Sequence, residues 1–178
     1  TRSAARIAAL PWADEVEVVE GDAADADAMD AATAGVDIVY FLVHSMISGR
    51  DYGRLDRAIA INVAKQAAAH RVGRIVYLSG LHPEGVELSA HLASREEVGD
   101  ILLASATPTI VLQAGVVIGS GSASFEMIRH LTEVLPYMPA PKWVRNHIQP
   151  IAVRDVIYYL LAAARVEGEV NDTFDIGG

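Results

Sequence analysis

A histidine and an arginine four residues apart are the clearest candidates for chemistry in this sequence. His91 and Arg95 lie in the segment 89–105, where helical spacing would place both side chains on one helix face. Histidine can donate a proton near neutral pH. Arginine stays protonated, so it can bind or orient a ligand but cannot transfer a proton. The alternative is that the pair belongs to a solvated helix face with no role in catalysis.

Small and polar residues follow four apolar runs, where predicted strands end. In a doubly wound parallel sheet, ligands bind beyond the carboxyl ends of the strands. Small residues at these points would let a flat cofactor pass close to the backbone. The alternative is that every strand simply leaves the sheet through a polar loop. The candidate cofactor contacts at these ends are Asp22, Val43, His44, Ser79, Gly80, Gln113, Ala114 and Gly115.

The histidines at these strand ends do not indicate a metal site. His44 and His82 follow neighbouring predicted strands and could meet in one cleft with His91. Zinc sites usually show closely spaced histidines or cysteines together with acidic partners, and no such spacing is present. We therefore expect polar loop residues here and no bound metal.

The scaffold for these residues alternates β-branched runs with alanine-rich stretches of helical spacing. Nearly continuous apolar runs are typical of parallel strands covered on both faces. The order predicts an α/β fold, a doubly wound parallel sheet of the Rossmann type in one domain over residues 1–178. We expect the helices at 51–70 and 89–105 to cover its two faces. The predicted strands are 16–19, 36–43, 74–78 and 109–112, and the predicted helices are 51–70, 89–105, 125–135 and 155–164.

The composition of the chain excludes several classes of partner and chemistry. The chain has 178 residues, a net charge of −9, no cysteine and no basic run. Nucleic acid is therefore an unfavourable partner, because its phosphates would be repelled. Disulfides and thiol nucleophiles are excluded, and no apolar run is long enough to span a membrane. These features favour a cytoplasmic protein and leave a homo-oligomer open.

An ordered series of motifs resembles the atypical and extended short-chain dehydrogenase/reductases. Residues 18–22 (VVEGD) resemble their third strand and its adenine-side aspartate, Asp22, and residues 35–40 (GVDIVY) resemble the fourth strand. Asn62, followed by residues 73–79 (GRIVYLS), matches their asparagine-bearing helix and fifth strand. Residues 112–119 (LQAGVVIG) and 151–156 (IAVRDV) resemble the sixth strand and the strand-turn-helix beyond it. The NmrA-like group and the nucleotide-binding accessory subunit of respiratory complex I are the most similar branches.

The resemblance implies a cofactor, NAD or NADP, and one departure bears on how it would bind. Relatives bind the pyrophosphate at a glycine-rich turn after the first strand, and no such turn is present in this sequence. We therefore expect the first strand–helix unit to be missing, and the chain as written to bind dinucleotide weakly or not at all. Relatives also continue beyond residues 174–178. Arg2 matches the position where NADP-specific relatives carry a basic residue for the 2′-phosphate, which favours NADP; the alternative is a surface arginine.

The second departure concerns catalysis. Relatives use a Tyr-x-x-x-Lys pair with a serine that contacts the substrate carbonyl. Here His91 and Arg95 stand at the tyrosine and lysine positions. Ser79 lies near the serine position; the alternative is that Gly80 stands there. The resemblance implies hydride transfer to a small carbonyl or quinone-like substrate, with His91 or a water as the proton donor. The alternative is a non-catalytic, dinucleotide-binding structural or redox-sensing module, which the lost tyrosine and lysine favour.

Overall fold

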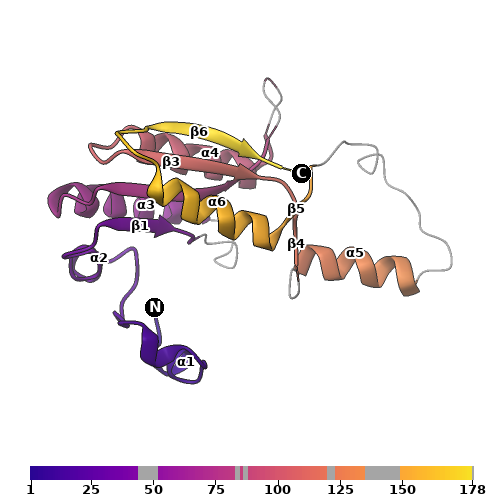
Figure 1. The fold of residues 1–178 in the computed structure, drawn as a ribbon, viewed down its shortest axis with the longest axis horizontal. Helices are drawn as coiled ribbons and strands as arrows, with labels where there is room; N and C mark the ends of the chain where they lie inside the picture. Colours follow the sequence, from indigo (N-terminus) through magenta and orange to yellow (C-terminus); the bar gives the residue numbers. More distant parts are fainter. Residues whose placement is uncertain (44–51, 83–84, 86–87, 120–122, 135–148, 178) are drawn as a thin grey trace.

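The computed structural model describes residues 1–43, 52–82, 85, 88–119, 123–134 and 149–177. Its centre is a parallel sheet of four strands in the order β1 (Ile38–Phe41), β2 (Arg74–Gly80), β3 (Thr109–Ala114) and β6 (Asp172–Ile176) (Figure 1). The register aligns Phe41 with Tyr77, and Ser79 with Gln113. The α/β fold with a parallel sheet, predicted from the alternating pattern, is confirmed.

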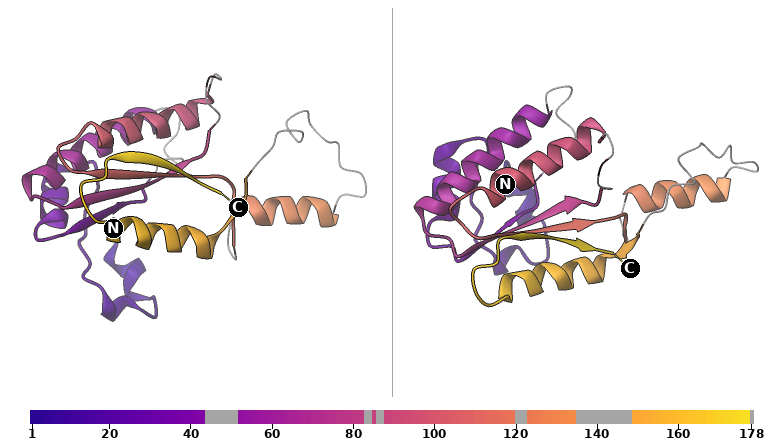
Figure 2. Two further views of the ribbon diagram at one scale, coloured as in Figure 1. Left: turned by 45° about the horizontal axis from the view of Figure 1, so that its top comes forward. Right: turned by 90° about the horizontal axis from the view of Figure 1, so that it is seen from above.

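Helices cover both faces of this sheet, although not in the predicted way. Both α3 (Tyr52–Ala69) and α4 (Ala90–Leu103) pack on one face, and α6 (Val153–Arg165) packs on the other (Figure 2). The expectation that the helices at 51–70 and 89–105 lie on opposite faces was wrong. Strands β1, β2 and β3 follow one another in one direction across the sheet, so right-handed crossovers place both helices on the same side.

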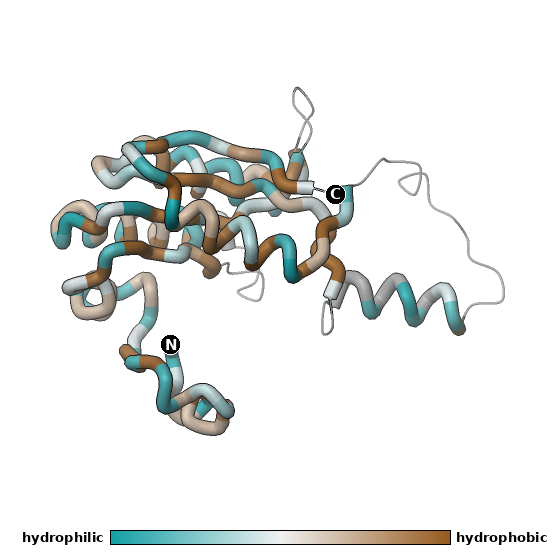
Figure 3. Tube along the Cα trace, in the orientation of Figure 1, coloured by the Kyte–Doolittle hydropathy of each residue, from teal (hydrophilic) through white to brown (hydrophobic). Residues whose placement is uncertain are grey.

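Strand alternation divides the core between the two faces. In β2, Ile75 and Tyr77 belong to the cluster that packs against α3 and α4, while Val76 belongs to the cluster that packs against α6. All three side chains are at most 3% exposed. The hydropathy colouring shows the same concentration of apolar residues along the central strands (Figure 3). Ser79 therefore lies on the α4 face of the sheet, two residues beyond Tyr77.

The predicted helices are close to the observed ones. The segments predicted at 51–70, 89–105, 125–135 and 155–164 correspond to α3, α4, α5 (Ala123–Val134) and α6. Helix α4 begins after Ser89, whose hydroxyl accepts a hydrogen bond from the Leu92 backbone N–H. A further helix, α2 (Ala26–Thr33), is capped by Asp25 in the same way and was not predicted.

The predicted strand at 16–19 is absent. In its place, residues 16–20 follow a short 3-10 helix (Ala13–Glu15) and contain no strand. The segment makes two backbone bonds to the first residue, from the Thr1 amino group to Val19 O (2.9 Å) and from Gly21 N to Thr1 O (2.8 Å). A strand requires a partner along its length, and β-branched residues alone do not provide one. A short helix, α1 (Ala4–Ala8), lies between Thr1 and this segment in the sequence.

Beyond β3, the chain forms a small second sheet. Strands β4 (Val117–Ile118) and β5 (Ile151–Ala152) pair in parallel, and α5 extends away from the main sheet (Figure 1). The Ile151 strand resembled the family motif and is present. Among the described helices, none is both long and apolar enough to cross a membrane.

A buried arginine ties the sheet to the end of α6. Arg74, the first residue of β2, is 7% exposed. Its guanidinium donates hydrogen bonds to the carbonyls of Ala163 (3.0 Å), Val166 (2.7 Å) and Gly168 (2.6 Å). The last carbonyls of a helix lack partners within the helix, and a cation is favoured there by the helix dipole. Arg74 thus caps α6 from the neighbouring strand.

Candidate functional site

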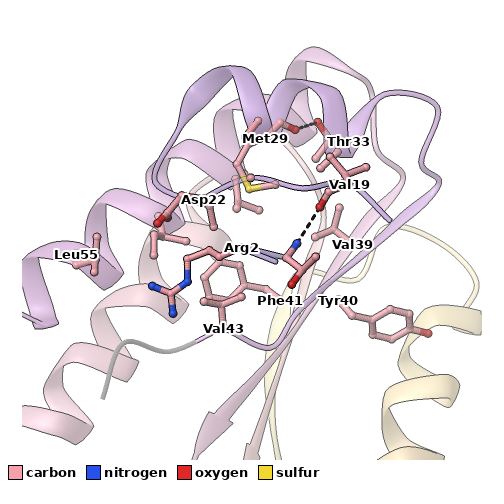
Figure 4. Close-up of a pocket in the computed structure, with 17 residues that line it drawn as sticks. Arg2, Val19, Asp22, Met29, Thr33, Val39, Tyr40, Phe41, Val43 and Leu55 are labelled. Atoms are coloured by element: carbon pink, nitrogen blue, oxygen red, sulfur yellow. Dashed lines mark hydrogen bonds between the residues drawn. The ribbon is translucent and has the colours of Figure 1, made fainter. Parts of the chain in front are cut away.

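The first part of the candidate site is a pocket of about 400 Å³ beside β1, which we call the N-terminal pocket. Arg2, Asp22 and Val43, three of the predicted cofactor contacts, all line it. Figure 4 shows the side chain of Arg2 extending from the N-terminal segment toward the pocket that Asp22 and Val43 also line. Residues more than forty positions apart in the sequence therefore meet at one cavity, as the predicted site required.

The walls of the N-terminal pocket are mostly apolar and its rim is polar. Phe41, Ile59 and Val63 contribute buried side chains from β1 and α3. At the rim, the Asp22 carboxylate accepts a hydrogen bond from Ala24 N (2.9 Å), which closes a turn after the extended segment. An apolar slot with a few polar groups at its mouth is the usual form of a nucleotide-base site.

Asn62 holds the rim of this pocket in place. Its side-chain amide donates a 2.9 Å hydrogen bond to the carbonyl of Ala23, next to Asp22. The sequence pointed to Asn62 as part of the resemblance without giving it a role. The available signal in the sequence was an asparagine within a long helix, because such a side chain often bonds to a nearby backbone group.

The second part of the site is a groove of about 550 Å³ between α4 and β6, which we call the α4 groove. Ser79, Arg95 and Gln113, all predicted site residues, line it, together with His82, for which the sequence predicts only a polar loop position. The Gln113 side-chain amide lies 3.2 Å from His82 Nε2, an arrangement in which the amide donates and the neutral ring nitrogen accepts. Two strand ends are thereby joined by a side-chain bond.

Two polar groups at the inner end of the α4 groove have no hydrogen-bond partner among the described residues. Ser79 is 3% exposed, and its hydroxyl lies close enough to the Tyr77 phenol to lower the phenol's pKa but makes no well-formed hydrogen bond. The buried Nε of Arg95 is unpaired. The other end of the Arg95 guanidinium makes one long bond, from Nη1 to Leu78 O (3.5 Å). Buried polar groups in proteins nearly always have partners, so unpaired donors beside a cavity are candidates for ligand contacts.

Tyr77 stabilises the inner end of the α4 groove by contacts with α4 and β1. Its phenol donates a 3.3 Å hydrogen bond to the Arg95 carbonyl, and its ring packs edge to face on Phe41. Burial raises the pKa of Tyr77 above 10.0, because the charged phenolate would lose solvation. The phenol is only 3% exposed, so Tyr77 positions the helix and does not reach a ligand.

The raised pKa of Tyr77 predicts a loss of stability at alkaline pH. The folded protein holds the phenol proton more tightly than the unfolded chain, so this stabilisation is complete below pH 10 and is lost as the pH rises through the raised pKa. We expect Tyr77→Phe to show a shallower decline in the free energy of unfolding above pH 10, measured by urea denaturation. Tyr158→Phe, at a 67% exposed position, should keep the decline of the parent protein. Equal declines in all three proteins would contradict the assignment.

The remaining predicted residues occupy different surroundings. His91 is half-buried in the first turn of α4, one helical turn before Arg95. Gly80 packs beneath Leu92, Ala114 is buried on the α6 face, and a Cβ on Gly115 would collide with the Gln149 carbonyl. These three positions bring the backbone close to its neighbours. His44 lies outside the described residues.

No metal centre forms among these groups. In the described part of the chain, no three histidine or acidic side chains lie close enough together to hold a metal ion. His82 Nε2 and Glu96 Oε1 are 4.0 Å apart, at the limit of an ion pair.

Comparison with known proteins identifies the chain at the level of the family. A family model described as NAD(P)H-binding matches residues 1–114, which include the N-terminal pocket and the strands that carry Ser79 and Gln113. The chain belongs to this NAD(P)H-binding family. No curated protein sequence matches it.

Solved structures with the same fold are distant in sequence from this NAD(P)H-binding protein. The dTDP-glucose 4,6-dehydratase DesIV from Streptomyces venezuelae has a TM-score of 0.73 at 17% identity, covering 98% of this chain and 61% of that one. The UDP-N-acetylglucosamine 4-epimerase from Bacillus cereus has a TM-score of 0.68 at 14% identity, covering 87% and 63%. The UDP-glucose 4-epimerase from Thermotoga maritima has 0.69 at 16%, covering 89% and 61%. The chain thus spans about three-fifths of these structures, and the likeness establishes the fold.

Proposed function

We propose that this NAD(P)H-binding protein is an atypical, NmrA-like reductase that uses NADP(H) to reduce a small carbonyl or quinone-like compound, and that it works in the cytoplasm. The observation that carries the proposal is the meeting of Arg2, Asp22 and Val43 at one pocket beside the carboxyl end of β1. Ligands of doubly wound sheets bind at this edge.

The described residues fit the adenosine end of a dinucleotide. The apolar slot suits the adenine ring, Asp22 can accept hydrogen bonds from it or from its ribose, and Arg2 can pair with a 2′-phosphate. Neither the sequence nor the described helix ends provide a glycine-rich turn for the pyrophosphate. Affinity of the chain itself should therefore come from the adenosine end.

The reaction would take place where β2 meets α4. When bound, the reduced nicotinamide supplies a hydride to the carbonyl carbon, and the carbonyl oxygen must gain a proton. Ser79 Oγ and the Arg95 guanidinium can hydrogen-bond to that oxygen, and His91 can donate the proton. The products are an alcohol and the oxidised nucleotide. His91 regains its proton from solvent, which its partial exposure permits.

A second candidate is a dinucleotide-binding module without catalysis. It is favoured by the separation of the predicted residues into two cavities, with Arg2, Asp22 and Val43 in one and Ser79, Arg95 and Gln113 in the other. Incubation of the protein with NADPH and a panel of quinones, aldehydes and ketones distinguishes the two. Oxidation of NADPH supports the reductase. Stoichiometric NADPH binding without oxidation of NADPH by any compound supports the binding module.

Arg2→Ala should weaken NADPH binding selectively. A charged hydrogen bond to the 2′-phosphate would be lost, so we expect a loss of about 1–3 kcal/mol for NADPH and little change for NADH, measured by calorimetry. Arg6→Ala is the matched control, because Arg6 is exposed on the neighbouring α1 and does not line the pocket. Equal losses for both nucleotides would show that Arg2 does not read the phosphate.

A further inference from the structure

The α4 groove is lined by more negatively than positively charged side chains. Three carboxylates line it, Glu96 and Asp100 from α4 and Asp175 from β6, against the single positive charge of Arg95. Glu96, Asp100 and Asp175 are all exposed at the rim, while the Arg95 Nε is buried at the inner end. The groove thus has an acidic mouth and a hydrogen-bond-donating interior.

The register of the sheet determines which end of the groove is acidic and which end donates hydrogen bonds. Ser79, Gln113 and Asp175 occupy one row across β2, β3 and β6, because Ser79 aligns with Gln113 and Gln113 with Asp175. Residues paired in a parallel sheet point to the same face, so the row runs from a buried hydroxyl through an amide to an exposed carboxylate. Val111 and Gly99 form an apolar floor beside the row.

The carboxylates are spread along the groove and do not gather at one point. No metal-binding group forms among the described residues, so a divalent cation does not account for them. An extended organic molecule can satisfy separated groups at once, with a positive end at the mouth and an oxygen at the interior. A cavity of about 550 Å³ has the usual size for such a ligand.

We propose that the α4 groove binds the organic substrate and that this substrate is a small carbonyl compound carrying a cationic amino group. The amino group lies among Glu96, Asp100 and Asp175, and the carbonyl oxygen accepts hydrogen bonds from Ser79 Oγ and Arg95 Nε. The unpaired Ser79 hydroxyl and the unpaired Arg95 Nε are thereby satisfied. This inference rests on the proposed function only for the reduction itself, because the binding can be measured without any nucleotide.

Four ring compounds that differ in one group test the proposal by calorimetry in the absence of NADPH. They are trans-4-aminocyclohexanol, which has both groups, cyclohexane-1,4-diol, which lacks the charge, 4-hydroxycyclohexanecarboxylate, which reverses it, and cyclohexylamine, which lacks the oxygen. We expect the aminoalcohol to bind tightest and the carboxylate weakest. Tightest binding of the carboxylate or the diol, or no binding of any probe, would overturn the proposal.

Variants locate the two ends of the ligand. Asp100→Asn and Asp175→Asn should each weaken aminocyclohexanol about 10-fold, because a charge-assisted contact is lost, and should leave the diol unchanged. Ser79→Ala should weaken the aminoalcohol about 5-fold but leave cyclohexylamine unchanged, because only the oxygen contact is removed. The matched control is Glu97→Gln, on α4 but paired with Arg57 (2.7 Å) outside the groove. Losses equal to those of Glu97→Gln would contradict the site.

The two proposals fail separately. NADPH binding and oxidation test the reductase, whereas nucleotide-free probe binding tests the groove. If the aminoalcohol binds and no compound is reduced, the groove site stands and the reductase does not. If NADPH is oxidised with neutral or anionic carbonyl compounds in preference to amino ketones, the reductase stands and the substrate class is wrong.

Discussion

Replacing Arg74 with methionine should remove about 1.5–3 kcal/mol from the free energy of unfolding, the range expected when hydrogen bonds to a charged group are lost. The methionine side chain can fill much of the space, but it donates no hydrogen bond. The buried carbonyl of Ala163 and the partly buried carbonyls of Val166 and Gly168 would then lose their present donor, at the end of α6 where the helix dipole is also uncompensated. Urea denaturation followed by circular dichroism measures the change.

Two further variants separate the causes of this loss. Arg74→Lys keeps the charge but cannot reach three carbonyls with a planar fork, so we expect roughly half of the loss. Arg154→Met, at an exposed position near the start of α6, should change stability by less than about 0.5 kcal/mol. A loss for Arg74→Met no larger than that of Arg154→Met would show that the contacts from Arg74 to α6 contribute little.

His91→Ala should lower the turnover of the proposed reductase by about 10²–10⁴-fold, the usual contribution of a general acid. The affinity for NADPH should stay nearly unchanged, because His91 lies on α4 and does not line the N-terminal pocket. Arg95 would still orient the carbonyl oxygen, so substrate affinity should change less than turnover. Steady-state kinetics with a compound that the NADPH panel has shown to be reduced gives both quantities.

The pH dependence of turnover provides a second measurement on His91. Because the protonated imidazole is the donor, turnover should fall as the pH rises through the pKa of His91, and this fall should be absent in His91→Ala. The matched control is His130→Ala, at an exposed position on α5, which should keep both the rate and the pH profile of the parent protein. Unchanged turnover in His91→Ala would remove this histidine from the mechanism.

The sequence predicted the strands that bury a continuous apolar surface. It did not predict where a strand forms only because a neighbouring strand pairs with it. The segments at 74–78 and 109–112 are β-branched and buried on both faces, so their pattern was sufficient to identify β2 and β3. The run at 16–19 has the same local character, but no described strand pairs with it, and Val19 O accepts a bond from the Thr1 amino group. Strand β6, which contains Asp172, Thr173 and Asp175, has no such pattern and is formed by pairing with β3.

Part of the candidate site could be predicted from the sequence, and part depends on how the helices pack. Strand alternation places Ser79 and Gln113 on one face, and the end of β1 brings Val43 to the sheet edge, so these three residues could be selected from their positions alone. Asp22 follows a segment that forms no strand, so its place at the pocket did not depend on the strand end predicted for it. The bond between Gln113 and His82 and the carboxylates of Asp100 and Asp175 depend on how α4 crosses the sheet. Helix packing angles are set by side-chain shapes across the whole interface, and a linear pattern does not specify them.

The pairing of β3 with β6 bears on how this protein can change over evolution. The two strands are adjacent in the sheet, although the chain between them, residues 115–171, forms β4, α5, β5 and α6. The entropic cost of closing such a long connection grows only with the logarithm of its length, and doubling it adds only about 0.6 kcal/mol. Insertions and deletions around α5 should therefore be tolerated by the sheet, so this connection can vary in length while the strands that hold Ser79, Gln113 and Asp175 keep their register.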